Sequence, residues 1–175
     1  MFKKMYQAGC RKFHIGAESA SPRILKEIYR KGIVPEDVRR TAALARQAGI
    51  KCFCFFMLGA PTETYAEMRG TGNFACALPV DEVSFSLATP LPGTYLHDIV
   101  KSDKKYVLSP DFSRYNYYSK RAFSEHGISE KRIKFYQLFY LAKFYLNPKR
   151  WGYITRHMAS FAGLRKLFRK ILRSL

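Results

Sequence analysis

The chain has 175 residues, of which 47% are hydrophobic, and its formal net charge is +18, from 31 Lys and Arg against 13 Asp and Glu. This apolar content is enough to build the core of one domain. No apolar run approaches the roughly 20 residues that cross a bilayer, and the N-terminal "MFKKMYQAGC" lacks the apolar centre of a secretory signal. We therefore expect a cytoplasmic protein without a transmembrane helix.

The positive charge is concentrated near the C-terminus. Residues 129–175 contain twelve Lys and Arg against one acidic residue, Glu130, a net charge of +11 that leaves +7 for residues 1–128. Charge of this kind bears on surface partners and not on the fold.

The cysteines show neither a disulfide framework nor a CxxC pair. They are Cys10, Cys52, Cys54 and Cys76. In a cytosolic chain they are expected to be reduced and mostly buried. Cys52 and Cys54 would share one face of a strand, but no nearby residues complete a set of metal ligands, so the sequence favours a structural role over a metal site.

The first half of the chain alternates predicted helices and strands. A helix closes at Gly9 and a short strand, "KFHIG", follows it. Ser21-Pro22 is typical of a helix start, and that helix is expected to stop at Gly32. A second helix is predicted from Pro35 to Ala48, with acidic residues in its first turn.

Two further strands follow. The run Cys52–Leu58 is uniformly apolar, which predicts a strand buried on both faces of a parallel sheet. A helix reaching about Ala77 and a strand at Val83–Ala88 come next. Helices between successive strands predict an α/β fold with parallel βαβ units. Three such strands cannot close a barrel, which indicates a fragment or a chain that is completed by a partner.

The C-terminal part has a different character. Residues 97–127 are predicted to be irregular, and a helix is expected from Ser129 to about Leu146. Residues 161–175 place Phe, Leu and Ile opposite Arg and Lys at helical spacing. Such a helix suits a membrane surface better than nucleic acid, because its apolar residues form a stripe. Docking on the chain's own barrel is an equally open alternative.

Three polar segments follow the three predicted strands, and we call them the strand exits. They are residues 16–19 ("GAES"), 59–64 ("GAPTET") and 88–94 ("ATPLPGT"). In a parallel sheet all the exits lie at one edge, where ligands bind. Their Gly, Ser, Thr and Glu residues suit a polar small molecule with amine and hydroxyl groups. Taken singly, each exit is better explained by turns, caps and ion pairs, whereas for the three together the two explanations are equally open.

The segments "AGCRKFHIGAESASPRILKEIYRKG", "AGIKCFCFFMLGAPTET" and "VSFSLATPLPGT" resemble the second half of a radical S-adenosylmethionine (SAM) domain. The similarity is strongest to the class with an N-terminal cobalamin-binding domain, which includes the anaerobic magnesium-protoporphyrin ester cyclases. The resemblance covers Lys3 to Asp98. It is specific, because three separate motifs occur there in the family's order and at its spacing.

This resemblance implies a partial TIM-like (β/α) barrel, of which "KFHIG", "CFCFFML" and "VSFSLA" would be the fourth, fifth and sixth strands. The residues that it assigns to the cofactor are Gly16, Glu18 and Ser19 at the ribose and methionine parts of SAM, Gly59, Pro61 and Glu63 beside the adenine, Thr89 with Pro90 toward the substrate, and the basic residues Arg23 and Lys31. A solvated helix face explains those two basic residues equally well.

The chain departs from the family in one large respect. It has no CxxxCxxC loop to hold a 4Fe-4S cluster, and its cysteines lack that spacing. This chain would therefore supply only part of the SAM-binding site. The cluster, and any cobalamin, would be bound by other parts of the intact enzyme. We expect residues 1–98 to be the second half of the barrel, 99–128 a connector and 129–175 a basic helical tail.

Such a chain is expected to be inactive alone. Its partner would be the missing N-terminal half or a complementary subunit. Two alternatives stay open: one half of a split radical SAM enzyme, and a non-catalytic module that binds a membrane surface or a protein partner. Nucleic acid is the less expected partner.

Overall fold

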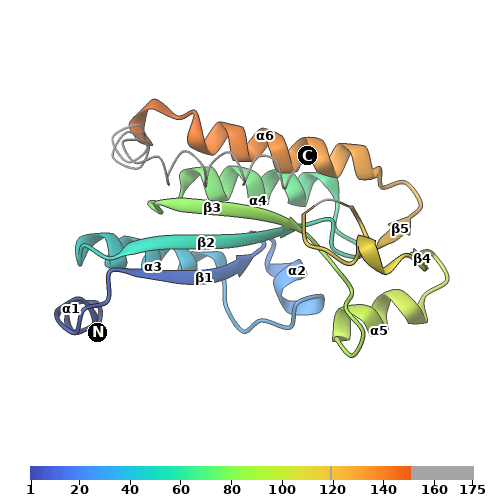
Figure 1. Ribbon diagram of the computed structural model, residues 1–175, viewed down its shortest axis with the longest axis horizontal. Coiled ribbons are helices and arrows are strands. Elements are labelled where there is room, and N and C mark those ends of the chain that lie inside the picture. The colour runs from blue at the N-terminus through green and yellow to red at the C-terminus, as the bar shows by residue number, and fades with distance from the viewer. Residues whose placement is uncertain (119, 151–175) are drawn as a thin grey trace.

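The computed structural model describes residues 1–118 and 120–150, and these form an α/β fold around a parallel sheet (Figure 1). The sheet order is β1-β2-β3, with β1 at Lys12–Glu18, β2 at Lys51–Leu58 and β3 at Glu82–Leu87. Both pairings are parallel. The predicted fold class is confirmed, and the three strand exits lie at the same edge of the sheet.

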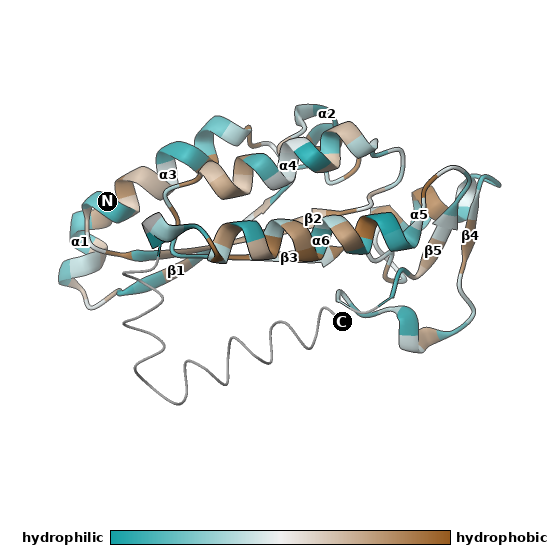
Figure 2. Ribbon diagram, turned by 90° about the horizontal axis from the view of Figure 1, so that it is seen from above, coloured by the Kyte–Doolittle hydropathy of each residue, from teal (hydrophilic) through white to brown (hydrophobic). Residues whose placement is uncertain are grey.

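Three of the six described α-helices connect the strands of the sheet. The six are α1 (Phe2–Gln7), α2 (Pro22–Glu27), α3 (Pro35–Gln47), α4 (Tyr65–Ala77), α5 (Tyr95–Ser102) and α6 (Glu130–Tyr145), of which α2, α3 and α4 are the connections. Helices α3 and α4 lie on the same side of the sheet, and α6 packs beside α4 and β3 (Figures 1 and 2). Thr64 caps α4, since its hydroxyl accepts the N–H of Glu67.

Helix α2 begins as predicted, with Ser21 accepting the N–H of Ile24. The prediction that it continues to Gly32 is wrong, because it ends at Glu27. Arg30 adopts a left-handed backbone with φ of 48°, which no helix interior accommodates. The chain turns there and brings Lys31 back toward β1.

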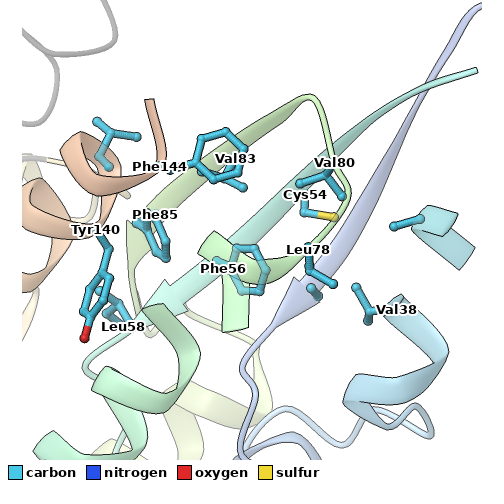
Figure 3. Packing of buried hydrophobic residues seen from close by; sticks show 14 of the residues in the cluster. Val38, Cys54, Phe56, Leu58, Leu78, Val80, Val83, Phe85, Tyr140 and Phe144 are labelled. Carbon is cyan, nitrogen blue, oxygen red and sulfur yellow. The ribbon is translucent and has the colours of Figure 1, made fainter. Parts of the chain in front are cut away.

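Strand β2 is buried unequally on its two faces, so the prediction of burial on both faces is wrong. Cys52, Cys54, Phe56 and Leu58 are buried, whereas the residues between them are half-buried. The buried face packs on the helices, as Figure 3 shows for Phe56 and the side chains around it. In residues 1–118 and 120–150 the helices that pack on β2 are α3 and α4, which lie on the same side of the sheet (Figure 2).

Side chains of helix α6 donate hydrogen bonds to backbone carbonyls on the outer edge of β3. The side-chain amide of Gln137 donates to the carbonyl of Phe85 at 2.8 Å, and the hydroxyl of Tyr145 donates to the carbonyl of Val83 at 3.3 Å. The N–H of Leu87 donates to the carbonyl of Tyr117 at 2.7 Å. An edge strand otherwise leaves such groups open to other chains. The helix predicted after Ser129 therefore closes one edge of the sheet.

The prediction that residues 97–127 are irregular is wrong in part, because α5 overlaps them and they also contain two short strands. Strands β4 (Tyr106–Leu108) and β5 (Phe123–Glu125) form an antiparallel pair beside α5. Within residues 1–118 and 120–150, no helix combines the length and apolarity needed to span a membrane. The amphipathic stretch predicted for residues 161–175 lies outside the described residues.

Candidate functional site

Unusual backbone conformations gather around the strand exits. In the described chain, the residues other than glycine with positive φ are Glu18 (59°), Arg30 (48°) and Thr62 (63°). Glu18 ends β1, Thr62 lies in the exit of β2, and Arg30 adjoins Lys31, which contacts Glu18. Residues in sparsely populated conformations concentrate at functional sites, so this edge of the sheet is the candidate site.

Glu18 is fixed on one side and open on the other. The Lys31 ammonium donates to Glu18 Oε1 at 2.8 Å and to the carbonyl of Gly16 at 2.7 Å. A Cβ added to Gly16 would lie only 2.6 Å from Glu18 Oε1, so glycine leaves room for this arrangement. Glu18 Oε2 is buried and has no hydrogen-bond partner in the part of the chain described. A buried acceptor of this kind is available to a ligand.

Ser19 holds the turn after β1 in place. Its side chain is buried, and its hydroxyl lies 3.2 Å from the hydroxyl of Thr71 in α4 and accepts the N–H of Ser21 at 3.0 Å. Thr71 in turn accepts the N–H of Ala20 at 3.1 Å. These bonds fasten the turn after β1 to α4, so the hydroxyl of Ser19 is used within the fold.

Arg23 joins α2 to the loop after β2. Its guanidinium binds Glu67 through two nitrogens, at 3.1 and 2.8 Å, and donates to the carbonyl of Thr62 at 2.9 Å. Burial by itself would raise the pKa of Glu67, but hydrogen bonds from Arg23, Thr64 and Ser21 outweigh it and lower the pKa to about 2. Arg23 thus holds two loops of the site together.

Glu63 braces the exit of β2 from within. Its Oε2 accepts the N–H groups of Gly59 at 2.7 Å and Ala60 at 3.0 Å, while its Oε1 is buried without a partner in residues 1–118 and 120–150. Burial raises the pKa of Glu63 to about 8, although the two N–H groups and the nearby Arg121 favour the carboxylate. Glu63 therefore fixes the loop and keeps one oxygen free.

Arg121 reaches this loop from the segment before α6. It is buried, and its guanidinium donates to the carbonyl of Gly59 at 2.9 Å and lies 3.7 Å from Glu125 Oε2. Burial lowers the pKa of Arg121, while Glu125 and Glu63 favour its charged form. The segment that follows α5 is thereby tied to the exit of β2.

Tyr29 places a hydroxyl among these charges. Its hydroxyl oxygen is buried and has no hydrogen-bond partner within the described residues. Burial raises the pKa of Tyr29 well above its usual value, and the carboxylates of Glu63 and Glu18 raise it further, whereas Arg121 lowers it. The hydroxyl thus lies within the electrostatic reach of residues from two strand exits and from the segment before α6.

The other predicted residues line the exits of β2 and β3. Gly59 and Pro61 are buried. Thr89 is also buried, and its hydroxyl contacts the carbonyls of Leu87 at 3.1 Å and Asn116 at 3.4 Å. These residues shape the backbone around the site, and the unpaired polar atoms come from Glu18, Tyr29, Glu63 and Arg121.

The described cysteines do not fit an iron-sulfur cluster. No group of three or more His, Cys, Asp or Glu side chains within residues 1–118 and 120–150 is placed to hold a metal. Cys52 and Cys54 have sulfurs 3.9 Å apart, and a hydrogen bond between them together with burial raises the pKa of Cys54. Cluster ligands are thiolates, so these two buried thiols are structural.

The raised pKa of Glu63 gives stability a specific pH dependence. A carboxyl whose pKa is higher in the folded than in the unfolded chain stabilises the fold below the unfolded pKa, and this contribution disappears as the pH rises through the folded pKa. The free energy of unfolding of the native chain should thus decrease from pH 5 to pH 8. In the Glu63→Gln variant this decrease should be smaller. Urea unfolding of both proteins at pH 5, 6.5 and 8 measures it; parallel profiles would contradict the assignment.

The sequence did not reveal Tyr29 or Arg121 as site residues. Tyr29 lies in a stretch predicted to be helix, and Arg121 lies in a stretch predicted to be irregular. Arg121 is one of several basic residues in that segment. The sequence therefore does not show that its side chain is buried, or that it bonds to Gly59, 62 positions earlier.

Part of the chain matches a known protein family. Residues 1–75, which include the exits of β1 and β2, match the family model of the Radical SAM superfamily. An uncharacterized methyltransferase of Pyrococcus horikoshii is 35% identical over 147 residues, which are 84% of this chain and 31% of the relative. A Methanocaldococcus jannaschii protein with a provisional methylthiotransferase description is 37% identical over 90 residues, which are 51% of this chain and 20% of the relative.

A solved structure has a similar fold. The archaeal Elp3 of Methanocaldococcus infernus with an N-terminal deletion superposes with a TM-score of 0.54 at 16% identity, covering 81% of this chain and 28% of that chain. The chain thus spans about a third or less of the length of these proteins. The family match and the relatives together support the radical SAM superfamily as the family of this chain.

Proposed function

We propose that this chain is the C-terminal part of a radical SAM catalytic domain and that its strand exits bind the adenosine and methionine parts of SAM. The observation that carries the proposal is Glu18, which lies in the family-matched segment and has a buried oxygen without a partner in the described chain. A carboxylate oxygen in this state suits a ribose hydroxyl, because the hydroxyl donates the hydrogen bond that the oxygen lacks.

The surrounding residues would hold that ligand in place. Lys31 orients Glu18 through its bond to Oε1 and leaves Oε2 for the ligand. Gly59 and Pro61, fixed by Glu63, would border the adenine, and Thr89 would lie toward the substrate. Ser19 and Arg23 would act by fixing the loops, since their polar atoms bond to Thr71, Ser21, Thr62 and Glu67.

A 4Fe-4S cluster, when bound in a radical SAM enzyme, supplies the electron that cleaves SAM. The described cysteines do not suit such a cluster, so we propose that its ligands come from an N-terminal half of the domain, in the same polypeptide or in a complementary subunit. Division into a half-barrel (1–98), a connector (99–128) and a basic tail (129–175) is part of this proposal, as is a cytoplasmic location.

The class of reaction is proposed from the relatives. Their descriptions name a methyltransferase and a methylthiotransferase, which supports transfer of a one-carbon or methylthio group for the complete enzyme. Similarity to the class with a cobalamin-binding domain, including the magnesium-protoporphyrin ester cyclases, rests on the three motifs in residues 3–98. Cobalamin would in that case bind outside this chain.

Binding of S-adenosylhomocysteine to the 175-residue chain tests the proposal without requiring activity. Replacing Glu18 by glutamine removes the charge of the acceptor, and a hydrogen bond to a charged group contributes about 1.5–3 kcal/mol. The affinity should therefore fall roughly tenfold or more. Equilibrium dialysis with radiolabelled ligand measures this loss.

The matched control is Glu36→Gln, because the Glu36 side chain is exposed on α3 and pairs only weakly with Arg39 at 3.3 Å. This variant should bind like the native chain. The proposal fails if the native chain shows no saturable binding, or if Glu18→Gln and Glu36→Gln bind equally well.

A further inference from the structure

Tyr29 is the residue of the site whose chemistry the family motifs do not explain. It follows α2, and its ring packs against a buried cluster that contains Ala60, from the exit of β2, and Ala88, from the exit of β3. Tyr29 therefore packs on the cluster that joins the stretch after β1 to two strand exits.

Other buried polar atoms near the strand exits also lack hydrogen-bond partners in the described chain. Glu63 and Glu18 are the carboxylates that raise the pKa of Tyr29, and Arg121 is the cation that opposes them. Glu18 Oε2, Glu63 Oε1 and Arg121 Nε are each buried and without a hydrogen-bond partner in the described chain. Together with the Tyr29 hydroxyl they leave both donors and acceptors open around the strand exits.

This arrangement costs the free chain stability. A buried hydroxyl without a partner costs stability, and phenylalanine would keep the ring packing without that cost. Buried polar groups that remain unpaired therefore point to a partner that arrives from outside. The partner must donate to the Glu18 carboxylate and also bond to a phenol and to Glu63, which carries a proton at neutral pH because its pKa is about 8. A group with several hydroxyls, or with a hydroxyl beside an amine, can do this.

We propose that Tyr29 is a specificity-determining residue of this site, and that its hydroxyl bonds to a hydroxyl or amine of the bound nucleoside between Glu18 and Glu63. This inference rests on the proposed SAM site and names a contact that the three motifs do not supply. It assigns the stretch after α2, together with the strand exits, to ligand binding.

Replacement of Tyr29 by phenylalanine separates a ligand contact from a structural role. The unpaired hydroxyl stabilises nothing in the free chain, so Tyr29→Phe should leave the urea midpoint unchanged or raise it. The same variant should bind S-adenosylhomocysteine roughly 3- to 10-fold more weakly, the effect of one neutral hydrogen bond. NMR titration of the chain labelled at tyrosine Cζ follows both weak binding and the Tyr29 signal.

The matched control is Tyr65→Phe, since the hydroxyl of Tyr65 is paired. It accepts the N–H of Ser129 at 2.7 Å and lies 3.5 Å from the carbonyl of Gly127. This variant should lower the urea midpoint and leave the affinity unchanged, the reverse of the result expected for Tyr29→Phe.

Each outcome decides one point. The inference is overturned if the native chain binds S-adenosylhomocysteine and Tyr29→Phe binds it equally well. It is also overturned if Tyr29→Phe loses as much stability as Tyr65→Phe, because a trapped water would then be the partner of the hydroxyl. Absence of binding by the native chain overturns the SAM site itself and the Tyr29 contact with it.

Discussion

Replacing Arg121 by methionine is expected to lower the free energy of unfolding by about 3 kcal/mol. Methionine keeps much of the apolar stem, which packs with the guanidinium 3.9 Å above the ring of Phe123. The substitution removes the cation that bonds to the carbonyl of Gly59 and faces Glu125. A buried carboxylate and a buried carbonyl would then lose their partner, and that loss dominates. Urea unfolding at pH 7 measures it.

Two further variants show whether the charge is the cause. Arg40→Met removes an arginine whose side chain is 71% exposed on α3, and it should change the free energy of unfolding by less than about 0.5 kcal/mol. Adding Glu125→Gln to Arg121→Met should recover part of the loss, because the two side chains interact directly. An Arg121→Met protein as stable as Arg40→Met would show that the connector is not fastened through this residue.

Replacing Gly72 by alanine is expected to destabilise the chain by about 2–3 kcal/mol. A Cβ at this position would lie 2.2 Å from the ring of Tyr140, at the contact between α4 and α6. Alanine favours a helix over glycine by about 1 kcal/mol, but the collision with a buried ring outweighs that gain. The result would be displacement of α6, which also covers the edge of β3. Thermal unfolding followed by circular dichroism measures the change.

Helix α4 contains its own control for this prediction. Gly70 lies in the same helix with open space where a Cβ would be, so Gly70→Ala should stabilise by about 0.5–1 kcal/mol. Replacing the ring by a smaller side chain, Tyr140→Leu, should reduce the loss of stability that Gly72→Ala causes. If both glycine variants are stabilised, α6 does not pack against α4 at this point.

The strand exits were predictable from sequence for a geometric reason. Parallel strands joined by helices must end at one edge, so the apolar runs and their polar followers were enough to bring Glu18, Gly59 and Thr89 to the same region. The local capping residues were equally readable, as the cap of α2 by Ser21 shows. These features depend on neighbours in the chain.

Features that depend on distant pairs were not predictable. The sequence does not show that the hydroxyl of Ser19 lies beside that of Thr71, 52 positions away. The burial of Arg121 depends on the position of the segment between α5 and α6, which periodicity does not specify. The half-buried face of β2 has the same origin, because a sequence shows that a strand is apolar and not how many layers cover it.

The most direct test of the central claim is a two-dimensional amide NMR titration of the 175-residue chain with S-adenosylhomocysteine. The account predicts saturable shifts at the three strand exits and beside them, around Glu18, Tyr29, Gly59 and Thr89, with none on the outer face of α3 near Arg40. Saturable shifts confined to residues away from the exits, or no saturable shifts at millimolar ligand, would contradict it.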